Sequence, residues 1–176
     1  FPAPLEAQTR VGNCRVLPGT RNAEGRSMGG GRVVYVQRPR LACEGGIRIN
    51  ADSMVAYEAT GFNQLMGAVM FEDESRLLLA RNARYFDQVG RLEADGDVEL
   101  TERESGNVLT GDNLLYLREG FGRQEEELTV WGERARALLQ PGSSGEEGAE
   151  GAEATPYDVE ATRIFLRGES YVRAIG

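Results

Sequence analysis

The residues best suited to acid–base chemistry are acidic side chains, and four of them alternate along one short stretch. Glu93, Asp95, Asp97 and Glu99 are each separated by one small or apolar residue. Paired carboxylates carry out glycoside hydrolysis, so a catalytic pair is one reading of this stretch. If the stretch is a strand, however, alternate side chains point to the same face. A row of carboxylates on one strand face is typical of a solvated surface, and we prefer that interpretation.

Other catalytic and metal-binding arrangements need residues that this chain lacks. The sequence contains no histidine, and its two cysteines are Cys14 and Cys43. A serine or cysteine nucleophile therefore has no imidazole to activate it, and a zinc site lacks its usual ligands. The acidic runs 72–74 and 125–127 lack the alternating oxygen ligands and the glycine of a calcium loop. We therefore predict a protein that is not an enzyme and holds neither a metal nor a cofactor.

A glycine run at residues 29–31 resembles a nucleotide-binding loop only superficially. It is followed by Arg32 instead of a Gly-Lys-Ser/Thr ending, and then by the apolar stretch 33–36. A phosphate-binding loop opens a helix, whereas this β-branched stretch is typical of a strand. The glycines therefore indicate a flexible turn before a strand.

Charge and hydropathy exclude two further classes. The net charge is −8, and all twenty basic residues are arginine. Binding to a nucleic-acid backbone needs clustered positive charge, so we do not expect a nucleic-acid partner. No run in the sequence approaches the roughly 18 consecutive apolar residues that a membrane-spanning helix needs.

The elements that would carry any function are short strands arranged in repeats. Residues 92–100 alternate between apolar or small residues and carboxylates without exception, which predicts a strand with one dry face. A small or acidic pair followed by an aromatic residue recurs at 51–57, 80–85 and 111–116, and more loosely at 132–137. Repetition at roughly 20 to 50 residues is the signature of stacked units that cannot bury their apolar face alone.

Regular turn signals and the absence of a sustained helical period predict an all-β fold with repeat character. We divide the chain into a partly flexible N-terminal extension (1–31), a repeat core (32–140), an acidic disordered loop rich in glycine and glutamate (141–157) and C-terminal strands that complete the same domain (158–176). Low apolar content in the acidic loop leaves too little surface to offset the entropy of ordering it.

The two cysteines permit a disulfide between Cys14 and Cys43, which would close a loop of roughly 30 residues and stabilise the fold by about 3 kcal/mol. The alternative is two unrelated buried thiols. The chain begins with Phe1 instead of methionine, so we expect that it has been processed or trimmed, and removal of a secretion signal is one interpretation. The cysteine pair weakly favours an exported protein.

Five stretches together resemble the OstA-like lipopolysaccharide-transport family. They are an isoleucine-rich lead-in with Ala-Asp-x-x-x-x-Tyr (47–57), Gly-x-Val (67–69), Ala-x-x-Ala-x-Tyr (80–85), Leu-x-Ala-x-Gly-x-Val (92–98) and Gly-Asp-x-Leu-x-Tyr (111–116). The match covers about half of the chain. The resemblance implies an open, twisted β-jellyroll of stacked antiparallel strands, located in the periplasm, whose apolar groove holds the acyl chains of lipopolysaccharide or a related lipid.

The groove candidates that follow are the apolar positions of the best repeats. They are Ile47, Ile49, Val55, Leu65, Val69, Phe71, Leu92, Val98, Leu100, Leu114 and Tyr116. The alternative is that these side chains pack on one another as a closed core. Arg32, Arg38 and Arg40 are candidates for contact with lipid headgroup phosphates, since guanidinium groups pair bidentately with phosphate oxygens.

Both ends of an open stack of strands leave unpaired backbone groups. Pro39 and the flanking arginines suggest that the strand at 33–36 forms a blunted N-terminal edge. The C-terminal candidate comprises Tyr171, Val172, Arg173, Ala174 and Ile175. We expect this edge to dock other transport-bridge proteins of the same fold or a second copy, head to tail. The competing hypothesis is a structural β-repeat scaffold of the cell envelope that assembles by edge-strand addition.

Overall fold

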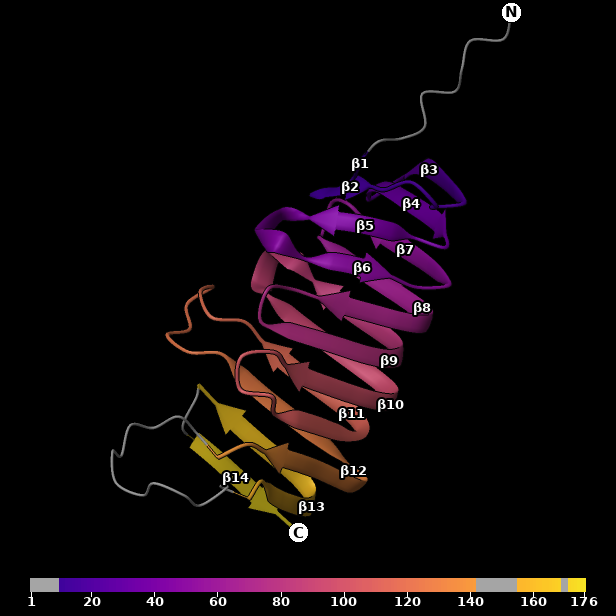
Figure 1. Cartoon of the computed structure of the whole chain (residues 1–176). Helices are drawn as coiled ribbons and strands as arrows, with labels where there is room; N and C mark the ends of the chain where they lie inside the picture. The colour runs from indigo at the N-terminus through magenta and orange to yellow at the C-terminus, as the bar shows by residue number, and fades with distance from the viewer. Residues whose placement is uncertain (1–9, 142–154, 169–170) are drawn as a thin grey trace, which may run out of the picture.

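A computed structural model describes residues 10–141, 155–168 and 171–176, and these residues form one antiparallel β-sheet (Figure 1). In chain order the strands are β1 (Arg10–Val11), β2 (Cys14–Val16), β3 (Asn22–Met28), β4 (Gly31–Gln37), β5 (Arg40–Cys43), β6 (Arg48–Asn50), β7 (Ser53–Tyr57), β8 (Phe62–Glu72), β9 (Arg76–Phe86), β10 (Arg91–Glu102), β11 (Val108–Leu117), β12 (Glu127–Leu139), β13 (Tyr157–Arg167) and β14 (Tyr171–Ile175). Two short 3₁₀ turns, η1 (Glu44–Gly46) and η2 (Asp87–Val89), complete the described elements. The strands lie across the long axis of an elongated molecule, with the N-terminal strands at one end and β14 at the other (Figure 1).

Each layer of the stack is one bent strand. The two halves of β8 pair with different strands, since residues 62–66 pair with β7 and residues 70–72 pair with β6. β6 and β7 are therefore the two halves of a single layer, interrupted at residues 51–52. In the same way β5 pairs with β6 and β4 pairs with β7. The chain is thus a meander of bent layers in which each layer contacts its neighbours in sequence.

The bends lie in a row along the sheet, which we call the spine, and the backbone there is left-handed. In β8 the register with β9 shifts between Met66 and Val69, which is one extra residue, a β-bulge. Gly67 has φ 75° in this bulge, and a Cβ on it would lie 2.3 Å from Asp52 Oδ2. Gly96 occupies the equivalent place in β10 with φ 80°. Gly67 and Gly96, which belong to the repeated stretches 67–69 and 92–98 of the sequence, therefore mark the spine.

The bends bring the two ends of the strands together. Arg76 of β9 is opposite Glu102 of β10, and Tyr116 of β11 is opposite Leu92 of β10. Glu102 and Leu92 are ten residues apart, so Arg76 and Tyr116 belong to opposite ends of the strands. In a flat sheet Arg76 and Tyr116 would be separated by about 30 Å. Instead, Arg76 Nη1 donates a hydrogen bond to the Tyr116 hydroxyl over 3.0 Å. The sheet is therefore rolled, and its strand ends meet along a seam.

We name the two sides of this seam by their turns. The first lip carries the turns at 58–61, 87–90 and 118–126, and the second lip carries the turns at 44–47, 73–75 and 103–107. The inside of the roll is a single apolar cluster that runs from Val11 near the N-terminus to Leu166 in β13. No charged or polar residue is buried among the described residues. The all-β prediction is confirmed.

Two expectations about the N-terminal part were wrong. Residues 10–31, assigned to a partly flexible extension, form β1, β2 and β3 within the sheet. The strand at 33–36 is not an edge, because β4 pairs with both β3 and β7. Pro39 lies instead at the interruption between β4 and β5, where its missing N–H removes no ladder bond. The acidic segment predicted to be disordered falls almost entirely outside the described residues.

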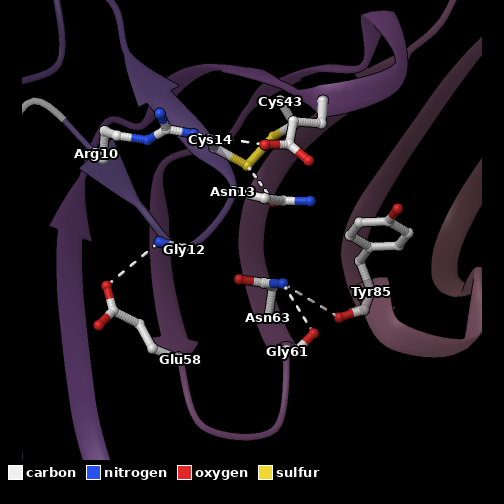
Figure 2. The surroundings of a disulfide bond; sticks show 10 residues. Arg10, Gly12, Asn13, Cys14, Cys43, Glu58, Gly61, Asn63 and Tyr85 are labelled. Atoms are coloured by element: carbon white, nitrogen blue, oxygen red, sulfur yellow. Dashed lines mark hydrogen bonds and ion pairs between the residues drawn. A yellow bond between two sulfur atoms is a disulfide. The ribbon is translucent and has the colours of Figure 1, made fainter.

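The predicted disulfide is confirmed, since Cys14 and Cys43 are bonded and directly opposite one another in the ladder of β2 and β5 (Figure 2). The turn between β1 and β2 reaches across the seam from this bond. There the Gly12 amide donates to Glu58 Oε1 on the first lip, at 3.3 Å (Figure 2). The hairpin of β1 and β2 thus covers the N-terminal end of the roll.

Candidate functional site

The apolar interior is the feature of this molecule best suited to binding, and it contains the predicted groove residues with one exception. Val55 is only half-buried and faces outward, while its neighbours Met54 and Ala56 point inward with exposures of 1% and 2%. The placement of Val55 in the groove was wrong. The other candidates all lie on the inner face and are at most 4% exposed: Ile47, Ile49, Leu65, Val69, Phe71, Leu92, Val98, Leu100, Leu114 and Tyr116.

The interior is filled by its own side chains. Its buried apolar residues are between 0% and 9% exposed. Two shallow hollows lie on the outside of the sheet. One, of about 420 Å³, is lined mainly by carboxylates and backbone near the spine, and the other, of about 350 Å³, lies on β13 and β14. A molecule that enters the interior must therefore displace side chains or separate the lips.

Besides the Gly12–Glu58 hydrogen bond at the N-terminal end, three sets of contacts join the lips over the N-terminal and middle parts of the seam. Arg118, on the first lip, approaches the backbone of Gly45 on the second. The rings of Phe71 and Tyr85 meet edge to face across the seam with centroids 5.3 Å apart. The third set is the polar group around Arg76. Among the described residues no comparable tie is found beyond β12.

We call the third set the clasp, which consists of Arg76, Glu102, Tyr116 and Glu126. The Arg76 guanidinium forms ion pairs with Glu126 across the seam and, at 3.5 Å, with Glu102 beside it. The Tyr116 hydroxyl receives a hydrogen bond from Arg76 and donates one to Glu126 Oε2 at 3.2 Å. These charged side chains are 12% to 23% exposed, so the ion pairs are screened less than surface pairs. The clasp therefore fastens the seam at its middle.

Two tyrosines at the seam have raised pKa values. Burial raises the pKa of the Tyr116 hydroxyl, and the positive charge of Arg76 opposes that shift. Burial likewise raises the pKa of Tyr85, with Arg118 opposing it. Both hydroxyls are therefore neutral at physiological pH, as hydroxyl groups above an apolar interior need to be.

The predicted headgroup arginines are not gathered into one site. Arg32 lies near the first lip and pairs with Glu58 at 3.6 Å. Arg38 lies on the spine with φ 47°. It is six residues from Arg32, which corresponds to about 20 Å along an extended strand. Arg40 is exposed at the start of β5. Only Arg38 and Arg40 remain near each other.

The predicted docking strand forms an edge of the sheet. β14 pairs with β13 over residues 163–167, and the other half of β13 has no β14 partner. Tyr171, Val172 and Ile175 are 42% to 46% exposed. Val172 and Ala174 are partners of Leu166 and Ile164, so they continue the inner face. Among the described residues no further strand pairs with β14, and the interior is uncovered by them at this end.

The described residues offer little for other chemistry. They contain no group of three or more histidine, cysteine or carboxylate side chains placed to hold a metal ion. The predicted wet face of β10 is confirmed, because none of its four carboxylates is buried while the apolar residues of the other face are. Asp95 and Asp97 bind Asn82 and Arg81 of β9 at the surface. None of the helical elements in the described parts of the chain has the length and apolar character to cross a membrane.

The clasp is the arrangement that sequence reasoning missed. Arg76 and Glu126 are 50 residues apart, and neither belongs to the alternating apolar pattern. A weak signal existed at Glu126, because it precedes the strand at 128–131 in a run of three glutamates. Only the rolled geometry brings that run to Arg76.

Comparisons with known proteins support the fold. No protein-family model matches the sequence, and no curated protein matches it. A solved structure does match in three dimensions: the crystal structure of LptH, the LptA-homologous periplasmic component of the lipopolysaccharide transport device of Pseudomonas aeruginosa. The superposition has a TM-score of 0.54 at 12% sequence identity and covers 83% of this chain and 93% of LptH. The chain therefore has the open β-jellyroll of the LptA-like proteins, as the resemblance in the sequence predicted.

Proposed function

We propose that this protein is a non-catalytic lipid carrier of the bacterial periplasm, which holds acyl chains of lipopolysaccharide or a related lipid inside its roll. The observation that carries the proposal is a wholly apolar interior that runs the length of the sheet and that no other described strand covers at β14. The similarity to LptH supports the same role, because that protein is a component of a lipopolysaccharide transport device. Acyl chains gain by leaving water for such a surface at about 0.8 kcal/mol per methylene group.

Lipid entry requires the roll to open, because the interior is filled. The C-terminal part offers the easier route, since Val172 and Ala174 are already exposed there and the clasp fastens the middle of the seam. Arg38 and Arg40, which are exposed and close in sequence, are the proposed contacts for headgroup phosphates. Arg32 is less suitable because it is already paired with Glu58.

The proposed partners are modules of the same fold, or a second copy, added at β14. An added strand would pair with the free edge and cover Val172 and Ala174, which extends the apolar interior without a gap. Neighbouring residues of a strand direct their N–H groups to opposite sides. Of the two single variants Val172→Pro and Arg173→Pro, one therefore removes an N–H that faces β13 and the other removes an N–H on the edge where a partner strand would add. We expect the substitution on the free side to weaken association in sedimentation while β13 stays protected from hydrogen exchange. A strict monomer at high concentration that recruits no such module contradicts this assembly.

The central experiment uses two adjacent residues that face opposite sides. A photo-crosslinking amino acid at Met54 points into the roll, and the same group at Val55 points away from it. We expect saturable binding of lipopolysaccharide to the purified protein, with crosslinks from position 54 and few from position 55. Failure of any lipid or acyl probe to bind removes the carrier function, and equal crosslinking from both positions removes the interior as its site.

The second candidate, a structural scaffold of the cell envelope, is favoured by the tight packing of the interior. It shares the edge-strand assembly at β14 but predicts that the interior never takes up lipid. Concentration-dependent oligomers together with a complete lack of acyl-probe binding would select the scaffold over the carrier.

A further inference from the structure

The outer face of β13 and β14 carries a surface unlike the rest of the sheet. Arg163, Phe165 and Arg167 alternate with the buried residues of β13 and so point outward. Their direct partners on β14 are, in the same order, Ile175, Arg173 and Tyr171. Every guanidinium therefore lies beside an aromatic or aliphatic side chain. We call these six residues the arginine face, and they line the shallow hollow of about 350 Å³ together with Thr129.

The six residues of the arginine face include three guanidinium groups and no carboxylate, although the whole chain carries −8 and Glu125 and Glu127 border the face beside Arg167. Arg163, Arg167 and Arg173 are exposed. Among the described residues Arg167 has an ion pair, with Glu125 at 3.6 Å, whereas neither Arg163 nor Arg173 has a carboxylate within 4.0 Å. Some arginines elsewhere on the outside are matched across strands, as Arg81 is with Asp97 and Arg136 is with Asp158, so the arginine face is set apart by the apolar side chains beside its guanidinium groups. Since fields are screened over about 8 Å at physiological salt, a partner senses the local charge and not the net charge.

The apolar members select the kind of anionic partner. Tyr171 and Ile175 are 43% and 46% exposed, and the Arg167 guanidinium lies 5.0 Å from the centre of the Tyr171 ring. Arginine and tyrosine with an aliphatic neighbour form the combination that settles at the level of lipid headgroups, because each has an apolar body and a polar end. A two-stranded face with a shallow hollow also suits a planar partner.

We propose that the arginine face is a docking surface for an anionic phospholipid bilayer. Guanidinium groups contact lipid phosphates, and Phe165, Tyr171 and Ile175 lie against the apolar parts of the headgroup region. The surface is on the outside of the sheet and is distinct from the interior proposed to hold acyl chains. Because it adjoins the uncovered end of the roll, docking would bring that end to the membrane surface.

The test measures cosedimentation of the purified chain with vesicles of neutral phosphatidylcholine and with vesicles that contain phosphatidylglycerol. Each arginine near an anionic surface contributes about five-fold to binding, so Arg163→Gln with Arg173→Gln is expected to weaken binding to the anionic vesicles about 25-fold. Both side chains are exposed, and circular dichroism is expected to show an unchanged fold.

Arg26→Gln is the matched control. It removes one positive charge, as each of the two test substitutions does, from an exposed arginine above Tyr35 (5.6 Å) at the other end of the molecule, and losses are compared per arginine. Arg26 has a carboxylate partner in Glu24. We expect this variant to bind like the parent. Soluble glycerophosphate tests whether phosphate alone suffices, and we expect no competition at concentrations at which anionic vesicles compete.

Four results overturn the proposal. They are equal binding to neutral and anionic vesicles, an equal loss in Arg26→Gln, full competition by glycerophosphate, and salt-sensitive self-association through the arginine face without vesicles. The last result would identify an acidic protein surface as the partner. None of these outcomes depends on lipopolysaccharide uptake, so a failure here leaves the proposed carrier function standing, and the reverse also holds.

Discussion

The two ends of the rolled sheet differ in how they finish the same repeated layer. At the N-terminal end the β1–β2 hairpin is held by a disulfide, buries Val11 to 2% exposure and reaches Glu58 across the seam. At the other end β14 covers half of β13 and leaves Val172 42% exposed. A repeat protein needs an end layer with a polar outer side to stay isolated. The difference therefore gives the described part of the molecule a direction, with a covered end at β1 and β2 and exposed inner-face positions at β14, where the proposed partner or lipid would add.

The largest expected effect is loss of the disulfide. Replacement of Cys14 and Cys43 by serine removes the cross-link of the covered end and should cost about 3–4 kcal/mol of unfolding free energy in the chain-entropy model. Urea denaturation measures the loss. Hydrogen exchange should show faster exchange in β1, β2 and β5, with β13 and β14 unchanged. Uniform loss of protection along the whole sheet would contradict the difference between the ends.

The next effect compares apolar side chains at the two ends. Leu41 is fully buried at the covered end, and Leu41→Ala should cost about 2–5 kcal/mol through lost burial and a cavity. Val172→Ala at the open end should cost less than about 1 kcal/mol, because the side chain is already partly in water. The measurement is again the urea midpoint. Similar costs for the two substitutions would show that the open end is covered in solution.

A smaller effect concerns the clasp. Tyr116→Phe removes the hydroxyl that joins Arg76 to Glu126 and should cost about 1–2 kcal/mol. Tyr171→Phe, on the exposed β14, is the matched control and should change stability by less than about 0.5 kcal/mol. If lipid enters through the seam, Tyr116→Phe should also speed the uptake of an acyl probe. Unchanged uptake and stability would mean that the clasp does not hold the lips.

The smallest effect appears only in alkali. The folded-state pKa values of Tyr85 and Tyr116 are raised above their ordinary value of 10.0. The folded protein therefore keeps protons that the unfolded chain releases, and this stabilisation, complete below pH 10, is lost as the pH rises through the folded pKa values. Thermal unfolding across this range measures it. A Tyr85→Phe, Tyr116→Phe double variant should lose less stability in alkali than the parent, and an equal loss would contradict the assignment.

The strands and their repeat were predictable because alternation is a local signal. Leu92, Val98 and Leu100 share a face in the sequence pattern and in the roll. Val55 was misplaced because both alternating sets around it are apolar, namely Met54 with Ala56 and Val55 with Tyr57. Pattern alone cannot select the inner set there. Pairing with β8 selects the inner set, since it places Met54 opposite the fully buried Leu65.

The N-terminal strands and the clasp were missed for different reasons. Every residue of β3 is exposed or half-buried, so its sequence lacks the apolar alternation that marks a strand. The strand β3 forms because its backbone pairs with β4. The clasp joins Arg76 to Glu126 only because the strands bend at the spine. Bends depend on left-handed glycines such as Gly67 and Gly96, whose effect on distant strand ends is not encoded in any local pattern.

The meander of bent layers also bears on how the chain folds. Each described layer pairs with the layers next to it in sequence, so forming a new layer closes only a short loop, and contacts of this kind favour rapid folding. A growing or emerging chain can add layers in order onto the first one completed. The disulfide lies within the first three layers, and its loop of 29 residues closes before β6 is needed. We therefore expect that oxidation fixes a nucleus at the amino-terminal end and that the sheet lengthens from there toward β14, the last strand to find a place.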